Sequence, residues 1–216
     1  MKTSQPGRKK PPLPESTVEA GVVEALVRGE HADPFAILGP HVASQGSERA
    51  VLIRAFLPRA EKVTVLPGDG TLSPTPMRRV HPDGFFEAVF PGRSNLFPYR
   101  LRWSDAAGAE VEREDPYRFP STLGEVDLYL IGEGTHYRAY EKLGAHPLAL
   151  EGVTGVLFAV WAPNARRVSV VGDFNGWDGR THPMRLHPGN GIWEIFVPGV
   201  DEGARYKFEI RARSGE

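Results

Sequence analysis

Phe56-Leu-Pro-Arg-Ala-Glu-Lys-Val-Thr-Val65 is matched later in the chain by Trp161-Ala-Pro-Asn-Ala-Arg-Arg-Val-Ser-Val170. Both stretches have an aromatic residue, a proline turn and an alternating apolar run in the same order. The spacing is 105 residues, from Pro58 to Pro163, and it becomes 107 residues further along, because two residues are inserted in a loop, where insertions cost little. Self-similarity at a nearly fixed spacing indicates a duplicated structural unit. The later matches are Met77-Arg with Met184-Arg, Gly84-Phe-Phe-Glu87 with Gly191-Ile-Trp-Glu194, Pro91-Gly with Pro198-Gly, and Tyr99-Arg with Tyr206-Lys.

The residues of each copy have the pattern of short β-strands. Apolar runs alternate with clusters of Gly, Pro and Asp, which is typical of sandwiches with many turns. The sequence therefore predicts an all-β protein with two tandem immunoglobulin-like β-sandwiches, a short N-terminal helix and an ordered connector. The strands expected in the first copy are Ala50–Phe56, Lys62–Leu66, Phe85–Phe90 and Tyr99–Trp103.

Four segments follow from this pattern. Residues 1–15 are basic and rich in proline, with little to bury, and are expected to form a disordered tail. Residues 16–119 are expected to hold the helix and the first sandwich, residues 120–150 the connector, and residues 151–216 the second sandwich.

The expected helix follows Ser16 and Thr17, either of which can accept hydrogen bonds from its first amides. From Val18 to Leu26, an apolar residue recurs every fourth position, so one face should be buried. In the connector, apolar residues such as Tyr137 and Tyr140 are expected to be packed away from water.

The two copies end differently. In the first, the Tyr99 strand is followed by a turn and by a closing strand near Glu110–Arg113. The residue equivalent to Gly108 in the second copy is Gly215, one residue before the last residue of the given sequence. The second sandwich is therefore expected to lack its last strand and to be part of a longer polypeptide.

Composition narrows the function. The net charge of -1 is unlike that of a nucleic-acid binder, which needs a basic surface. The chain has no cysteine, its seven histidines are not spaced as metal ligands, and no glycine-rich phosphate loop is present, so neither a metal nor a cofactor is expected. No apolar run approaches the roughly 20 residues that span a bilayer, and there is no signal peptide, so a cytoplasmic protein without membrane contact is expected.

One loop has the composition of a binding site. Val171-Gly-Asp-Phe-Asn-Gly-Trp-Asp178 follows a predicted strand and places Trp177 between Asn175 and Asp178. An exposed indole can stack on a sugar ring while the neighbouring polar side chains reach its hydroxyls. The alternative is that Trp177 closes the end of the sandwich, as aromatic residues often do. The first copy has no aromatic residue in its matching loop, which favours binding.

Charged and aromatic residues on the predicted strands extend this hypothesis. Arg185 and Lys207 are the basic residues expected beside the loop, since both can donate to several hydroxyls, although a solvated strand face is an equal alternative. Trp161 and Trp193 are expected to lie in the core.

The stretch Phe158-Ala-Val-Trp-Ala-Pro-Asn-Ala-Arg-Arg-Val-Ser-Val-Val-Gly-Asp-Phe-Asn-Gly-Trp-Asp-Gly-Arg180 resembles the glycogen-binding module (carbohydrate-binding module family 48 type) of 1,4-alpha-glucan branching enzymes. His31–Gly39, Asp115–Phe119 and Glu133–His146 resemble the extra N-terminal module of the longer bacterial forms. In modules of this type, residues matching Trp177 and Lys207 contact glucan.

The resemblance implies a non-catalytic region of a glycogen-biosynthesis enzyme that binds α-glucan, such as glycogen or malto-oligosaccharides. The catalytic carboxylates of the family lie on a (β/α)₈ barrel that would follow in the same polypeptide, so no residue of this chain is expected to be catalytic. Two alternatives remain open, namely a structural spacer and a stand-alone glycogen-targeting module.

Overall fold

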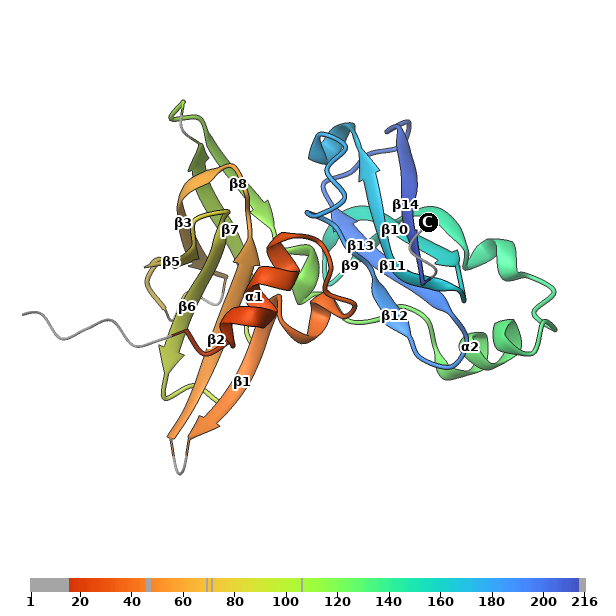
Figure 1. The fold of residues 1–216 in the computed structure, drawn as a ribbon, viewed down its shortest axis with the longest axis horizontal. Coiled ribbons are helices and arrows are strands. Elements are labelled where there is room, and N and C mark those ends of the chain that lie inside the picture. Colours follow the sequence, from red (N-terminus) through yellow and green to blue (C-terminus); the bar gives the residue numbers. More distant parts are fainter. Residues whose placement is uncertain (1–15, 46–47, 69, 71, 106, 214–216) are drawn as a thin grey trace, which may run out of the picture.

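The computed structural model describes residues 16–45, 48–68, 70, 72–105 and 107–213, which form two β-sandwiches placed side by side (Figure 1). The expected disordered tail lies outside the described residues, as does the region of Gly215. The first sandwich has one antiparallel sheet in the order β1-β2-β6-β5 and another in the order β4-β3-β7-β8. Their bounds are β1 (Gly39–Gln45), β2 (Glu48–Phe56), β3 (Ala60–Pro67), β4 (Thr75–Pro76), β5 (Arg78–His81), β6 (Phe85–Pro91), β7 (Tyr99–Asp105) and β8 (Glu110–Glu114).

The second sandwich repeats this arrangement. One sheet has the order β12-β13-β10-β9, and β11 pairs with β14 opposite it. The all-β prediction is therefore confirmed. Among the described residues, no helix is long and apolar enough to cross a membrane. The strands are β9 (Gly144–Leu150), β10 (Val153–Trp161), β11 (Ala165–Gly172), β12 (Arg185–His187), β13 (Ile192–Pro198) and β14 (Tyr206–Ala212).

The duplication reaches further than the sequence pattern indicates. Helix α1 (Ala20–Val27) is followed by the short 3₁₀ helix η1 (Pro34–Ala36), and 105 residues later α2 (Glu125–Gly132) is followed by η3 (Ala139–Glu141). Strand β9, at the same spacing from β1, pairs with β10 through seven residues, so the second sheet begins at Gly144 and not at residue 151. The segment expected to be a connector is thus the helical start of the second copy.

Helix α1 covers the outer face of the β1-β2-β6-β5 sheet. Val23, Leu26 and Val27 are buried there, which stabilises the fold by about 1.5–3 kcal/mol for each side chain. The expected capping differs in detail: Ser16 Oγ accepts a hydrogen bond from Val18 N before the helix begins, whereas Thr17 bonds to Glu87. Thr17 is thereby committed to the sheet and not to the helix end.

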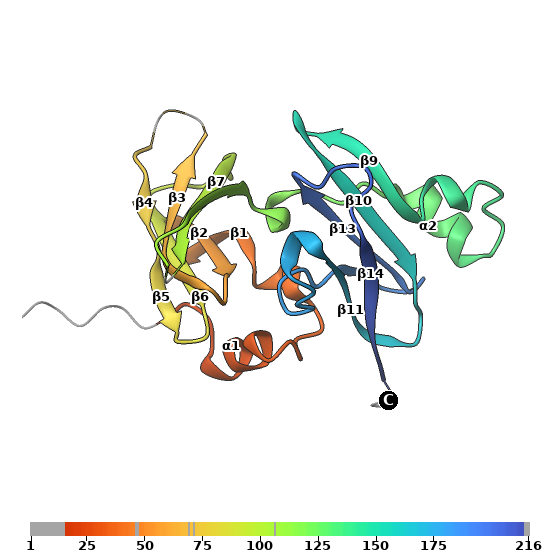
Figure 2. The same ribbon diagram turned by 90° about the horizontal axis from the view of Figure 1, so that it is seen from above.

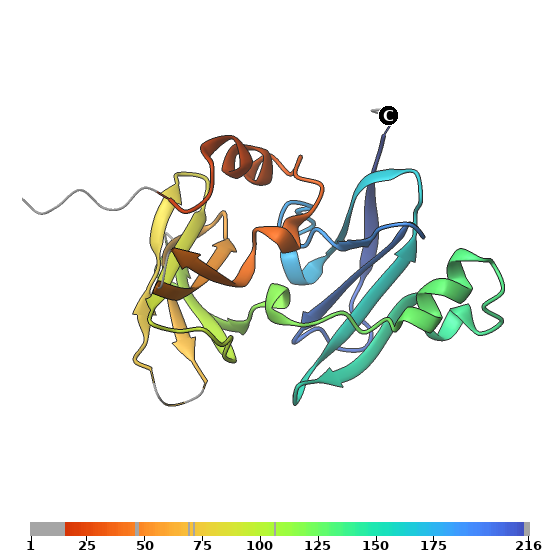
Figure 3. The ribbon, with the colours of Figure 1, turned by 90° about the horizontal axis from the view of Figure 1, so that it is seen from below.

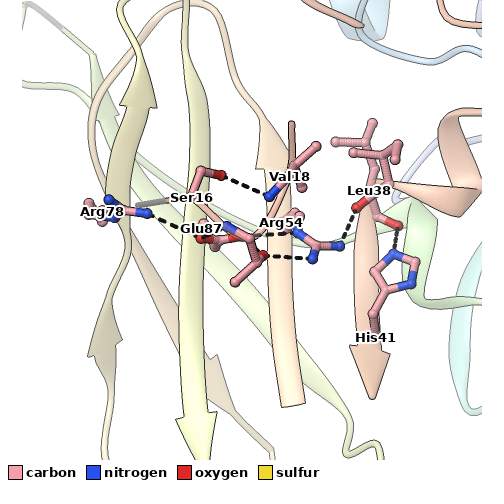
Figure 4. Close-up of polar contacts among 9 residues, drawn as sticks. Ser16, Val18, Leu38, His41, Arg54, Arg78 and Glu87 are labelled. Carbon is pink, nitrogen blue, oxygen red and sulfur yellow. Dashed lines mark hydrogen bonds and ion pairs between the residues drawn. The ribbon is translucent and has the colours of Figure 1, made fainter. Parts of the chain in front are cut away.

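A buried ionic cluster fastens this helix to the sheet (Figure 4). The Glu87 side chain is only 2% exposed, and it pairs with Arg54 Nε at 3.0 Å and with Arg78 Nη2 at 3.2 Å. Thr17 donates to the same carboxylate through its backbone N at 3.4 Å and through its hydroxyl. We name Thr17, Arg54, Arg78 and Glu87 the Glu87 cluster.

The second copy has an equivalent cluster around Glu194. This carboxylate accepts from Thr122 Oγ1 at 3.0 Å and from Thr122 N at 3.3 Å, and it pairs with His187 Nε2 at 2.9 Å and Arg185 Nη1 at 3.5 Å. The spacing from Thr17 to Thr122 is again 105 residues. The two copies therefore share the polar attachment of their helical segments as well as their strands.

The two helical segments differ in their surroundings: that of α1 is packed between the sandwiches, and that of α2 is exposed. Helix α1 lies on the side of the first sandwich that faces the second, and its apolar residues belong to one core that continues into the second sandwich (Figures 1 and 2). Helix α2 lies at the far end of the second sandwich (Figure 3). Tyr137 is 97% exposed and Tyr140 is 69% exposed, so the expectation that these tyrosines are packed away from water is wrong.

The two tryptophans that were expected in the core, Trp161 and Trp193, differ in burial. Trp193 is fully buried and its Nε1 donates to Ala162 O at 3.1 Å, which confirms that expectation. Trp161 is 57% exposed, because it lies on the outer face of its sheet near the α2 segment. Its counterpart Phe56 is buried in the apolar core that α1 shares with the second sandwich, and Arg180 lies 5.9 Å from the centroid of its ring.

Candidate functional site

The candidate site is the loop that follows β11. The 3₁₀ helix η4 (Asp173–Asn175) begins directly after Gly172, and the next two residues, Gly176 and Trp177, have positive φ angles of 64° and 63°. Glycine adopts this left-handed conformation without strain, but a side chain such as tryptophan pays roughly 1–2 kcal/mol for it. Strained residues of this kind occur preferentially at functional sites.

The side chain of Asn175 fixes the shape of the loop through hydrogen bonds within it. Its Oδ1 accepts from Gly172 N at 2.9 Å, and its Nδ2 donates to Val170 O at 3.0 Å and lies 2.9 Å from His182 Nδ1. These contacts occupy the side-chain amide within the loop. The structure therefore gives Asn175, predicted to reach sugar hydroxyls, the role of shaping the loop.

Phe174 anchors the loop to the core. Its ring stacks on Phe158 with 6.0 Å between centroids and meets the His182 ring edge-on at 5.7 Å. Burial lowers the pKa of His182 to about 4, and the nearby positive charge of Arg113 adds to this effect. His182 is therefore neutral at pH 7 and serves as a hydrogen-bonding part of the loop base.

Trp177 is presented on the outside of this base. It is 43% exposed, and its Nε1 donates to Asp173 Oδ1 at 3.0 Å. The other carboxylate oxygen of Asp173 accepts from Arg205 Nε at 2.8 Å. Hydrogen bonds from Arg205 and Trp177 lower the pKa of Asp173. The indole is thus fixed in orientation while one side remains accessible.

Sequence reasoning missed the roles of Asp173 and Arg205. Asp173 stands four residues before Trp177, across a turn, and this spacing was the available signal. Arg205 had no comparable signal, because its position beside Asp173 depends on the antiparallel pairing of β11 with β14.

Lys207 lies at the same end of the sheet as Trp177. It is exposed on β14, opposite Val171, while the carbonyl of the following residue, Gly172, accepts from Trp177 N at 3.0 Å. Strand pairing thus brings the predicted lysine to the strand end from which the tryptophan loop emerges.

Asp178 and Arg185 have other partners. Asp178 Oδ2 accepts from Arg180 Nη2 at 2.8 Å, and this hydrogen bond lowers the pKa of Asp178. Arg185 lies on β12, where its Nη2 donates to Phe119 O at 3.0 Å and its guanidinium lies 4.0 Å from the centroid of the Phe35 ring. The structure places Arg185 in the contact between the sandwiches and away from the Trp177 loop.

Replacing Trp177 by glycine is expected to test the strain directly. Because alanine keeps the cost of a positive φ and glycine does not, Trp177→Gly should be as stable as Trp177→Ala or up to about 1 kcal/mol more stable, despite the flexibility that glycine adds to the unfolded chain. Urea unfolding of the two variants measures the difference. If Trp177→Gly is less stable than Trp177→Ala by 1 kcal/mol, the backbone at this position is not strained.

Comparisons with known proteins match both copies. Residues 19–117 match the model described as the N-terminal domain of alpha-1,4-glucan branching enzyme GlgB, and residues 142–216 match carbohydrate-binding module 48, described as the isoamylase N-terminal domain. The second match starts two residues before β9, in agreement with the sheet that the structure shows.

Curated relatives match nearly the whole chain. The 1,4-alpha-glucan branching enzyme GlgB of Cereibacter sphaeroides is 52% identical over 99% of this chain and 28% of its own length. The corresponding enzyme of Rubrobacter xylanophilus is 54% identical over 89% of this chain and 25% of its own length. The chain thus spans about a quarter of the length of these relatives.

Among solved structures, pullulanase type I of Bacillus subtilis in complex with maltose aligns with 80% of this chain and 23% of its own, at 17% identity and a TM-score of 0.28. This TM-score is too low to establish a common fold.

Proposed function

Because the chain belongs to the 1,4-alpha-glucan branching enzyme family, of which it is the N-terminal part, we propose that it binds α-glucan without catalysing a reaction itself. Trp177 provides the stacking surface, and Lys207 provides a donor to the sugar hydroxyls. The bound glucan is positioned for a (β/α)₈ barrel of the longer polypeptide, which forms α-1,6 branches.

One observation carries this proposal, namely the exposed and strained Trp177 held by Asp173. A tryptophan that closes the sandwich would be buried, as Trp193 is, and would not need a left-handed backbone. Here the backbone of Trp177 is in the left-handed conformation, and the Nε1 hydrogen bond fixes the indole while part of the ring stays in water. Such preorganisation lowers the entropy lost when a flexible ligand binds.

A second role is supported for the first sandwich, as a rigid spacer. Its helix α1 and the second sandwich share one apolar core, and Tyr117 Oη donates across the contact to Thr181 O and Pro183 O, each at 3.3 Å. A core that continues between two sandwiches limits their relative motion.

Trp177→Ala is expected to weaken binding of maltoheptaose at least tenfold, because a tenfold change is about 1.4 kcal/mol, the size of one lost aromatic contact. Isothermal titration calorimetry and affinity electrophoresis in glycogen both measure the loss. The control is Tyr137→Ala, which removes an aromatic residue that is 97% exposed and far from the loop, and it should leave binding unchanged. Equal affinity of Trp177→Ala and the wild type would disprove the assigned site.

A further inference from the structure

We propose that the cleft between the two sandwiches is a second α-glucan subsite, next to the Trp177 loop and built partly from the first sandwich. This inference rests on the proposed function, because it takes the same class of ligand. It assigns sugar contacts to a sandwich whose own matching loop has no aromatic residue.

The cleft is a cavity of about 410 Å³, within the size range of small-molecule sites. One wall consists of the turn Leu57–Arg59 with Trp103 and Arg113 from the first sandwich. The other wall includes Asp173–Gly176, the segment that supports Trp177. A glucan chain bound to the loop therefore has the cleft directly beside it.

Trp103 gives this cleft an aromatic surface. It continues the inward face of β7 beyond Tyr99 and Leu101, which are buried, but it is itself only partly buried. Its indole packs against the first core and also lines the cavity. An indole supported by a core on one side and facing a cavity on the other is suited to contact the apolar face of a sugar ring.

Two arginines supply donors. Arg113 Nη1 donates to Phe174 O at 3.4 Å, which places its guanidinium across the cleft. Arg59 lies against Gly176, since a Cβ added to that glycine would be 2.9 Å from Arg59 Nη2. Each guanidinium has five N–H donors in a rigid plane, more than these contacts use.

The charges around the cleft favour a neutral ligand. Arg59 and Arg113 are accompanied in the lining by five acidic residues, namely Asp105, Glu114, Asp115, Asp173 and Asp178. An anion such as a phosphate would meet these carboxylates, whereas a neutral chain of hydroxyl groups can bond to both arginines and carboxylates. The combination of apolar walls, an indole and mixed donors and acceptors points to an oligosaccharide.

The indole N–H signals of the chain test the inference directly. The chain has four tryptophans, so a ¹⁵N-labelled sample gives four indole signals, which Trp→Phe variants assign. With maltoheptaose, we expect the signals of Trp177 and Trp103 to shift and those of Trp161 and Trp193 to stay. In Trp177→Ala, the Trp103 signal should still shift, at higher ligand concentration.

A double variant, Arg59→Met with Arg113→Met, retains the aliphatic part of both side chains and removes the donors. Its affinity for maltoheptaose should fall about fivefold or more, and Tyr137→Ala should have the wild-type affinity. A Trp103 signal that stays while Trp177 shifts would overturn the cleft subsite and leave the proposed function intact, as would wild-type affinity of the double variant. A Trp103 shift without a Trp177 shift would support the cleft and refute the site at Trp177. Absence of both shifts refutes both.

Discussion

Glu87→Gln is expected to lower the free energy of unfolding by about 3–5 kcal/mol, the cost of leaving a buried charge without its partner. The side chains of Arg54 and Glu87 are 8% and 2% exposed, so water cannot replace the lost carboxylate. Burial by itself would raise the pKa of Glu87, but hydrogen bonds from Thr17 and Arg54 outweigh it and hold the pKa below its usual value. The ionised carboxylate is thus the form that the fold requires.

Glu194 has the same place in the second copy, but Ala159 stands where the first copy has Arg54, and the partners Arg185 and His187 are 23% and 13% exposed. Glu194→Gln is therefore expected to cost less than Glu87→Gln. The matched control is Glu61→Gln. Glu61 is 58% exposed and pairs with Arg79 at 3.8 Å, so its replacement should change stability by less than about 0.5 kcal/mol. Urea unfolding at pH 7 measures all three variants.

The double variant Glu87→Leu with Arg54→Met separates charge from packing. It removes both buried charges and keeps apolar bulk, so it should recover much of the stability that Glu87→Gln loses. A loss below 1 kcal/mol in Glu87→Gln would show that the cluster does not hold the helix to the sheet.

Asp115 and His182 are expected to give the chain opposing pH dependences. Burial raises the pKa of Asp115 to about 6, against hydrogen bonds from Tyr99 and Tyr117 that lower it. The usual pKa of an aspartate, 3.8, applies to the unfolded chain, so the protonated carboxyl contributes about 3 kcal/mol to the stability of the fold. This contribution is fully present below the unfolded pKa and is lost as the pH rises to about 6. His182 acts in the other direction, because its lowered pKa makes stability fall as the pH drops from about 6.5 to about 4.

Between about pH 4 and 6 the two contributions therefore offset each other in the wild type. Asp115→Asn removes one of them, so its stability relative to the wild type should decrease by roughly 2–3 kcal/mol on going from pH 7 to pH 4. Urea unfolding at pH 4, 5, 6, 7 and 8 checks this. The comparison uses the change with pH, so a constant difference from altered hydrogen bonds to Tyr99 does not affect it. Parallel curves for the two proteins would contradict the assignment.

The sequence alone was sufficient where local chemistry decides the structure. The proline turns and alternating runs predicted the strands of the first copy, and the predicted strand end at Phe56 agrees with the structure, in which the aligned Trp161 also ends a strand. The first helix was predicted from its apolar spacing, but its equivalence to the second was not, because Ala20–Val27 and Glu125–Gly132 have no apolar pattern in common. The equivalence of the two helical segments depends on contacts between residues far apart in the sequence, namely those of the Glu87 cluster and of the cluster around Glu194. The sequence pattern does not reveal such contacts.

At the candidate site, too, the sequence revealed local features but not contacts that depend on tertiary structure. The composition of the loop was enough to single out Trp177, but side-chain partners are set by tertiary structure. Arg185 belongs to the matched pair Met184-Arg185, yet it lies over Phe35 in the contact between the sandwiches. Trp161 and Phe56 are equivalent in sequence, and only one of them is covered by a neighbouring sandwich.

The paired clusters at Glu87 and Glu194 have an evolutionary consequence. A buried ion pair is often no more stable than apolar residues of the same size, so stability alone does not explain why both copies retain one. Any single substitution on the way to an apolar replacement leaves one charge buried without a partner. That intermediate would lose about 3–5 kcal/mol from a domain whose total stability is roughly 5–15 kcal/mol. Selection against these intermediates would preserve the buried carboxylate, which both copies share, although Ala159 stands in the second copy where the first has Arg54.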